Sequence, residues 1–189
     1  MGEKGWCIWI TGLPGSGKST VSAALMQLLK RKKIQAQLLS SDALRAIMTP
    51  KRSYTLEERD AVYATLVNIA RLLTQNGVNV VIDATGNLRR YRQNARENIP
   101  FFIEVYLECP LKVCVQRETG RTTRYHAPTQ IYMKAEKGES STVPGVGQPY
   151  EPPQKAEVAL DTTECSPTEC AKQILKRAIL PPKRRKEKS

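Results

Sequence analysis

The chain has 189 residues, of which 40% are hydrophobic, and its formal net charge at pH 7 is +12. This length and composition are typical of one globular domain with a hydrophobic core, and no apolar run approaches the roughly 20 residues of a membrane-spanning helix. Five cysteines without a C-x-x-C pair argue against a disulfide framework, and the start of the chain has no signal-peptide pattern, so we expect a cytoplasmic protein with reduced thiols and no membrane partner.

Short apolar runs alternate with helical patterns along the chain. Such alternation predicts an α/β fold, with a parallel β-sheet flanked by helices. The predicted strands are Trp6–Thr11, Ala36–Leu39, Val78–Asp83, Phe101–Leu107 and Glu157–Leu160. The predicted helices are Ser19–Lys32, Leu56–Gln75, Arg89–Glu97, Pro110–Arg117 and Pro167–Arg177.

The first predicted strand leads into GLPGSGKS, residues 12–19, which fits the phosphate-binding pattern G-x-x-x-x-G-K-[ST]. Glycines let backbone N–H groups turn inward toward an anion, and the N-terminus of the following helix points to the same place. We expect Lys18 to reach the β- and γ-phosphates of ATP as a catalytic residue, and Ser19 to place its hydroxyl on Mg²⁺. The predicted nucleotide-binding residues of this loop are Gly12, Leu13, Pro14, Gly15, Ser16, Gly17, Lys18, Ser19 and Thr20.

Two carboxylates follow predicted strands, at the edge where a parallel sheet binds its ligand: Asp42 after the second strand and Asp83 at the end of the third. Phosphoryl transfer needs a metal and a group that orients or deprotonates the acceptor hydroxyl, so both acids are candidate catalytic residues. Two structural alternatives stay open. Asp42 could cap a helix that begins at Ala43, and Asp83 could stabilise a turn at residues 85–87. Arg45, one helical turn beyond Asp42, could face the same pocket.

Residues 118–155 form a polar, Gly- and Pro-rich region with little apolar periodicity. A segment of this length is either disordered or functional, and its basic residues Arg121, Arg124, Lys134 and Lys137 favour a lid over bound phosphates. We therefore predict a single domain over residues 1–180, with the lid at about 118–155, and a basic tail at 181–189.

The chain resembles the adenylylsulfate (APS) kinase family, which phosphorylates the 3′-hydroxyl of APS with MgATP to give PAPS. The resemblance is carried by GLPGSGKST, by PFFIEVYLECPLKVCVQRE at residues 100–118, and by YMKAEKGESSTVPGVGQPYEPP with AEVALDT within residues 132–162. It implies a P-loop kinase fold with a lid over the nucleotides, and ATP and Mg²⁺ as cofactors.

The resemblance also implies roles for individual residues. Arg117 joins the nucleotide-binding residues, and Ser19 and Asp42 hold the metal. Asp42 matches an acid on the metal and hydroxyl side, Arg45 and Arg59 match APS-binding positions, and Lys134 matches the lid lysine. The implied substrate-binding residues are Asp42, Arg45, Tyr54, Arg59, Thr85, Lys134 and Val143.

The chain departs from the family pattern on the substrate side. Ser40 replaces the first Asp of D-G-D-N, Val62 replaces the Asn of E-N, and Gly86 replaces the serine of I-S-P-Y. Of the two aromatic residues that sandwich the APS adenine, Tyr54 remains and Val143 replaces the other. Because stacking of a base on an aromatic side chain is worth about 1–3 kcal/mol, we expect weaker APS binding than two aromatics would give.

APS is the predicted small-molecule substrate, in sulfate assimilation, and the sequence leaves a homodimer open. One alternative is a P-loop kinase of another hydroxyl, such as a polynucleotide 5′-end, an aminoacyl-tRNA or a small metabolite. SSDALR and VVIDATG resemble polynucleotide-kinase-like and zeta-toxin-like P-loop kinases, and the net charge of +12 also favours a nucleic-acid acceptor. Another alternative is a non-catalytic nucleotide-binding regulator, which Asp42 and Asp83 argue against.

Residues 183–189 contain five basic residues and one glutamate, and they follow Pro181 and Pro182. We predict that deleting these seven residues leaves APS-dependent ADP release unchanged, because the tail lies beyond the last predicted helix. A deletion that abolishes ADP release, or that removes a steeply salt-dependent binding of RNA, would instead identify the tail as a nucleic-acid-binding arm.

Overall fold

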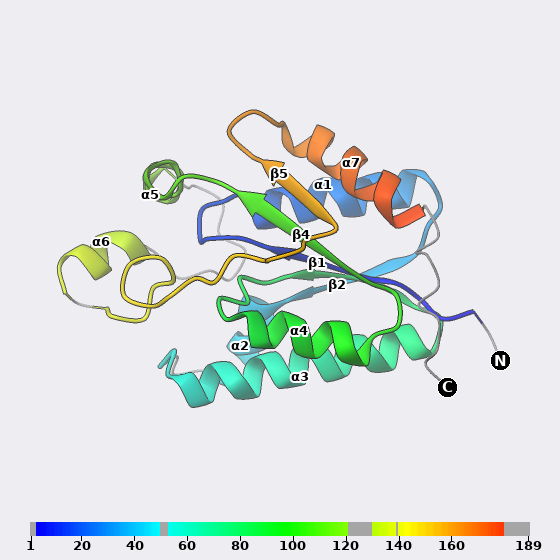
Figure 1. The fold of residues 1–189 in the computed structure, drawn as a ribbon, viewed down its shortest axis with the longest axis horizontal. Helices are drawn as coiled ribbons and strands as arrows, with labels where there is room; N and C mark the ends of the chain where they lie inside the picture. Colours follow the sequence, from blue (N-terminus) through cyan, green and yellow to red (C-terminus); the bar gives the residue numbers. More distant parts are fainter. Residues whose placement is uncertain (1–2, 50–52, 121–129, 139, 180–189) are drawn as a thin grey trace.

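The computed structural model describes residues 3–49, 53–120, 130–138 and 140–179 (Figure 1). Within them, five parallel strands form one sheet in the order β2-β3-β1-β4-β5, which confirms the predicted α/β fold. The predicted basic tail and the lid residues Arg121 and Arg124 lie outside the described residues. The strands are β1 Cys7–Thr11, β2 Ala36–Ser40, β3 Asn79–Asp83, β4 Phe102–Glu108 and β5 Val158–Asp161.

Helices cover both faces of the sheet (Figure 1). Ile8 and Ile10 of β1 pack on the face covered by α1 and α7, whereas Cys7 and Trp9 pack on the face covered by α3 and α4. This alternation follows from the period of two in a strand. Because both faces are covered, every residue of β1 is buried, and the strand reads in the sequence as a continuous apolar run.

Each of the five predicted helices is present, with both ends within two residues of the prediction, and the described residues contain two further helices, α2 and α6. None of them combines the length and apolar character needed to cross a membrane. The helices are α1 Lys18–Arg31, α2 Ser41–Met48, α3 Leu56–Gln75, α4 Arg89–Asn98, α5 Leu111–Thr119, α6 Ile131–Glu136 and α7 Pro167–Ile179.

Helix α6 lies in the predicted lid, where the sequence showed little periodicity. It is short, and it is held by Tyr132, which is buried in a cluster with Cys109, Cys114 and Val143. The Tyr132 hydroxyl donates a hydrogen bond to the carbonyl oxygen of Pro14 at 2.8 Å. Helix α6 is therefore packed directly on the glycine-rich loop.

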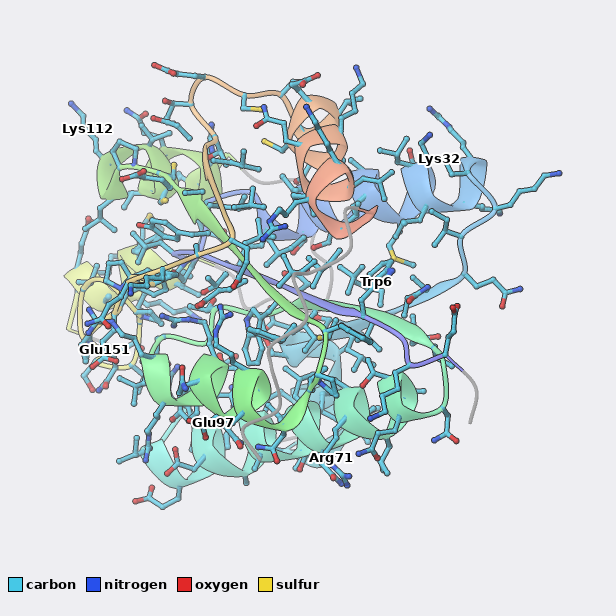
Figure 2. The ribbon with its side chains drawn as sticks, turned by 45° about the vertical axis from the view of Figure 1, so that its right-hand side comes forward. Trp6, Lys32, Arg71, Glu97, Lys112 and Glu151 are labelled. Atoms are coloured by element: carbon cyan, nitrogen blue, oxygen red, sulfur yellow. The ribbon has the colours of Figure 1, made fainter. Side chains whose placement is uncertain are left out.

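The basic charge is spread over the surface of the described residues. Figure 2 shows Lys32, at the C-terminal end of α1, and Lys112, at the start of α5, at opposite ends of the molecule. The exposed Glu97 of α4 lies on the lower side of the same view, where Arg71 of α3 is also found (Figure 2). A mixed surface of this kind is typical of a soluble enzyme as well as of a nucleic-acid-binding protein, so the charge by itself does not separate the predicted acceptors.

The turn between β3 and α4, residues 84–88, packs tightly against the sheet. The Trp9 indole donates to the carbonyl oxygen of Ala84 at 2.9 Å, and the Gly86 amide donates to the Tyr63 hydroxyl at 2.9 Å. Gly86 has a φ of +49°, and a Cβ atom at this position would lie 2.8 Å from the Trp9 ring. The turn therefore requires glycine at residue 86 for backbone conformation and for space.

We predict that Gly86→Ala lowers the free energy of unfolding by about 2–4 kcal/mol, because it adds the cost of the left-handed backbone to a clash with a buried ring. Gly138→Ala is the matched control, since Gly138 has a φ of +73° and open space around its Cα. The control should lose only the conformational cost of about 1–2 kcal/mol. Denaturant unfolding measures both, and equal losses would contradict the proposed clash.

Candidate active site

A cavity of about 550 Å³ opens at the carboxyl ends of the strands. This volume lies within the range of small-molecule sites. Its walls come from the glycine-rich loop, α2, α3, the turn after β3, α5 and the lid. The predicted site residues that line it are Pro14, Gly15, Gly17, Lys18, Ser19, Thr20, Asp42, Arg45, Tyr54, Arg59, Asp83, Thr85, Arg117, Lys134 and Val143.

One end of the cavity is formed by the glycine-rich loop. The Lys18 ammonium group donates to the carbonyl oxygens of Gly12 at 3.2 Å and Leu13 at 2.9 Å, so these two predicted residues support Lys18 and do not line the cavity. Ser16 is buried behind the loop, and within the described residues its hydroxyl has no hydrogen-bond partner. The loop also passes close to α5, since a Cβ atom on Gly15 would lie 2.3 Å from the carbonyl oxygen of Cys114.

The two predicted catalytic acids line the same cavity as Lys18. The alternative role for Asp42, as the cap of a helix that begins at Ala43, is wrong: α2 begins at Ser41, and the hydroxyl of Ser40 accepts from the Ala43 amide at 3.4 Å. Because Ser40 satisfies this donor, the Asp42 carboxylate is not needed as a cap. Asp83 ends β3 and is largely buried at the cavity wall.

This group of oxygen atoms suits Mg²⁺. The ion takes oxygen ligands, commonly one or two carboxylates together with substrate phosphates and water. Ser19 lines the cavity from α1, Asp42 from α2 and Asp83 from the end of β3. The residues present therefore fit a magnesium ion that arrives with a nucleotide.

The opposite end of the cavity is cationic. Arg45 is 3% exposed, forms an ion pair with Glu58, and places its guanidinium carbon 4.8 Å from the centre of the Tyr54 ring. The Nε atom of Arg45 and the hydroxyl of Tyr54 are buried, and neither has a hydrogen-bond partner within the described part of the chain. Both residues line the cavity, so a ligand with acceptor atoms at this end could satisfy these two donors.

Glu58 orders this end of the cavity, a role that sequence reasoning missed. Burial alone would raise the pKa of Glu58, but hydrogen bonds from Ser53 and Tyr54 and from the Arg45 guanidinium outweigh it and lower the pKa to about 2. The carboxylate accepts from the Ser53 amide and hydroxyl, both at 2.7 Å, and from the Tyr54 amide at 3.0 Å. These bonds hold Tyr54 at a φ of +55°, a left-handed conformation that is uncommon for a tyrosine.

Arg59 joins three segments around the same end. Its guanidinium donates to the carbonyl oxygen of Tyr54 at 3.1 Å, to the Asn87 side-chain oxygen at 3.4 Å and to the carbonyl oxygen of Thr142 at 2.5 Å. Burial lowers the pKa of Arg59, although an arginine remains charged at any working pH. Arg59 lines the cavity as predicted, and it also ties the lid to the turn after β3.

Arg117 and the lid close the remaining side. Arg117 donates to the side-chain oxygen of Thr162 at 2.9 Å and to its carbonyl oxygen at 2.7 Å, which fixes the guanidinium next to the glycine-rich loop. Lys134 reaches the cavity from α6. Val143 is only 5% exposed and packs in the cluster with Tyr132, so it offers the cavity one edge of an apolar patch.

The comparisons with known proteins agree with one another. The family model for adenylylsulphate kinase matches residues 4–161. An adenylyl-sulfate kinase from Halothermothrix orenii is 36% identical over 92% of this chain and 89% of that protein, and a probable adenylyl-sulfate kinase from Pyrococcus abyssi is 31% identical over 93% of this chain and 95% of that protein. The structure of the Mycobacterium tuberculosis APS kinase in complex with AMPPNP and APS has a TM-score of 0.82 to this chain, at 29% identity, covering 93% of this chain and 98% of that one.

We predict that Asp42→Asn lowers kcat for ATP-dependent phosphoryl transfer by about 100-fold or more with little change in ATP affinity, because the role expected from the sequence places the carboxylate on the metal and the acceptor hydroxyl. Ser40→Ala is the control: it removes the helix cap and should cost about 1 kcal/mol of stability while leaving kcat within a few-fold. If Asp42→Asn only lowers the melting temperature by a similar amount and keeps kcat, then Asp42 has a structural role alone.

Proposed function

Because the chain belongs to the adenylylsulfate kinase family, we propose that it transfers the γ-phosphoryl group of ATP to the 3′-hydroxyl of APS and so produces PAPS in sulfate assimilation. The observation that carries this proposal is the cavity with a phosphate-binding loop at one end and the unsatisfied donors of Arg45 and Tyr54 at the other. APS is an anion with an adenine ring, so it offers acceptor oxygens to Arg45 and a stacking face to Tyr54.

The proposed mechanism is one of positioning and charge stabilisation. Backbone N–H groups of the glycine-rich loop and the Lys18 ammonium group hold the β- and γ-phosphates, for which Lys18 exchanges its present carbonyl partners for phosphate oxygens. Ser19 and Asp42 would hold Mg²⁺, and the bound ion would supply positive charge next to the transferred group. Asp42 or Asp83 orients the acceptor hydroxyl and takes its proton as the oxygen attacks the γ-phosphorus and ADP leaves.

The lid residues complete the site in this proposal. Lys134 adds a positive charge near the phosphates, and Arg117 borders the nucleotide from the side of α5. Arg59 draws Thr142 of the lid toward the acceptor end. A closed lid excludes water, which would otherwise compete with APS as the acceptor.

Three further points belong to the same proposal. We infer that Mg²⁺ is the metal, since the ligands are oxygen atoms and substrate phosphates. A cytoplasmic location is consistent with five free cysteines in the described chain. A homodimer and any binding of nucleic acid stay predictions.

We predict that ADP release in the presence of MgATP depends on APS, with a KM in the micromolar to millimolar range. The assay compares APS with a 5′-hydroxyl oligonucleotide, a seryl-tRNA and water alone. Lys18→Ala should abolish the APS-dependent rate, because the transition state loses a charged phosphate contact. If APS gives no rate above water while another acceptor does, the proposed substrate is wrong. If no acceptor gives a rate although ATP binds, a non-catalytic regulator becomes the better description.

A further inference from the structure

Arg92 extends from α4 into the protein and is only 1% exposed. It does not line the cavity, and neither the glycine-rich loop nor the catalytic acids contact it in the described hydrogen bonds. A buried guanidinium keeps its charge, so it is stable only where a carboxylate and several acceptors are fixed around it. The positions of those acceptors indicate what Arg92 holds in place.

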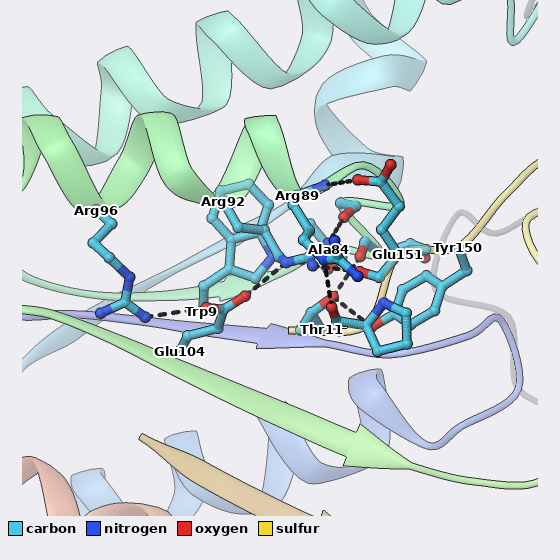
Figure 3. A network of polar contacts seen from close by, with 12 residues as sticks. Trp9, Thr11, Ala84, Arg89, Arg92, Arg96, Glu104, Tyr150 and Glu151 are labelled. Carbon is cyan, nitrogen blue, oxygen red and sulfur yellow. Dashed lines mark hydrogen bonds and ion pairs between the residues drawn. The ribbon is translucent and has the colours of Figure 1, made fainter. Parts of the chain in front are cut away.

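The planar group of Arg92 binds three segments at once (Figure 3). Its Nε atom donates to Glu104 of β4 at 2.6 Å, one Nη atom donates to the carbonyl oxygen of Gly86, and the other donates to the carbonyl oxygen of Glu151 at 2.5 Å. Its guanidinium carbon also lies 5.8 Å from the centre of the Tyr150 ring. One side chain thereby connects the sheet, the turn after β3 and the C-terminal end of the lid.

The hydrogen bond from Arg92 to the carbonyl oxygen of Gly86 fixes a wall of the cavity. Residues 83–85 line the cavity and are followed directly by Gly86. The Thr11 hydroxyl, at the end of β1, donates to the carbonyl oxygen of Thr85 at 2.5 Å and lies 3.1 Å from the Tyr150 hydroxyl (Figure 3). The wall is therefore held from β1 on one side and by Arg92 on the other.

The hydrogen bond from Arg92 to the carbonyl oxygen of Glu151 fixes the end of the lid. The Gln148 amide donates to the carbonyl oxygen of Val143 at 3.0 Å, so residues 143–148 form a closed turn. The segment after this turn is held by Asn87: the Asn87 side chain donates to the carbonyl oxygen of Pro149 at 3.0 Å, and the Glu151 amide donates to the carbonyl oxygen of Asn87 at 2.8 Å. The lid therefore ends on the same turn that forms the cavity wall.

We propose that Arg92 is a positioning residue for the acceptor: it sets the distance between the cavity wall at residues 83–85 and the lid turn at residues 143–148. This rests on the proposed function, because the acceptor is taken to bind between these two segments. Lysine cannot replace arginine here, since one ammonium group cannot reach Glu104 and two carbonyl oxygens in fixed directions. ATP binding should depend on Arg92 much less, because the glycine-rich loop is held by β1, α1 and α5.

Arg96 provides a matched control one turn further along α4. It pairs with Glu104 at 3.0 Å, and so shares a carboxylate with Arg92, and it pairs with Glu157 at 2.5 Å. Its described hydrogen bonds reach neither the turn after β3 nor the end of the lid (Figure 3). A substitution of Arg96 therefore weakens the same ion-pair network without releasing the two cavity walls.

The experiment compares Arg92→Lys with Arg96→Lys in the full chain. We expect Arg92→Lys to raise the KM for APS by about tenfold or more, because small displacements of a bound reactant are costly, while the KM for ATP stays within about twofold. Amide hydrogen exchange at Gly86 and Glu151 should accelerate in Arg92→Lys beyond any change at the core residue Ile82. Arg96→Lys should show neither effect.

An APS KM within twofold of wild type in Arg92→Lys, or an equal rise in Arg96→Lys, would overturn the proposal. If the wild-type protein does not use APS, the kinetic comparison fails together with the proposed function, and hydrogen exchange decides alone. Unchanged protection at Gly86 and Glu151 in Arg92→Lys then overturns the proposal. Should Arg92→Lys be too unstable to purify, Arg92→Gln and Arg96→Gln are compared by the same measurements.

Discussion

The parallel pairing of β1 with both β3 and β4 is the constraint on which the site depends. Parallel strands end at the same edge of a sheet, so the glycine-rich loop after β1, α2 after β2 and the turn after β3 must meet there. The pairing is possible only because β1 is apolar on both faces and is buried by two layers of helices. The apolar residues that bury β1 thus bring Lys18, Asp42 and Asp83 to one cavity, although they are far apart in the sequence.

Buried ion pairs then set the fine geometry at this edge. Arg45 pairs with Glu58 near the cavity, and Arg92 pairs with Glu104 behind it. A buried pair of this kind contributes little net stability, because desolvation offsets most of the attraction between the charges. It does impose direction, since each guanidinium must meet its carboxylate in a fixed geometry, and that of Arg92 must also meet two carbonyl oxygens. The structure therefore uses buried arginines where loops without regular hydrogen bonding have to be held in one arrangement.

Local patterns predicted much of this structure, and long-range partners account for what they missed. The glycine-rich loop was predictable because its whole pattern lies in residues 12–20, next to its strand and helix. The cap of α2 was not, because serine and aspartate cap equally well and the sequence places Ser40, Ser41 and Asp42 in a row. The role of Arg92 was not predictable either, since Glu151 lies 59 residues away and two of the three acceptors, on Gly86 and Glu151, are backbone carbonyls that no residue type reveals.

If the acceptor binds at the end of the cavity formed by Arg45 and Tyr54, as we propose, this end has to compensate for the aromatic residue that Val143 replaces. Tyr54 has the guanidinium groups of Arg45 and Arg59 at 4.8 and 5.8 Å from its ring centre, so its position is fixed before any ligand binds. A rigid stacking partner loses little conformational entropy on binding, and a fixed cation next to it meets an anion without reorganisation. Val143 contributes to the lid cluster with Tyr132 instead, which keeps the lid packed on the glycine-rich loop. Under the proposed function, a preorganised lid and a preorganised cationic wall would offset part of the stacking energy that an aromatic residue at position 143 would give.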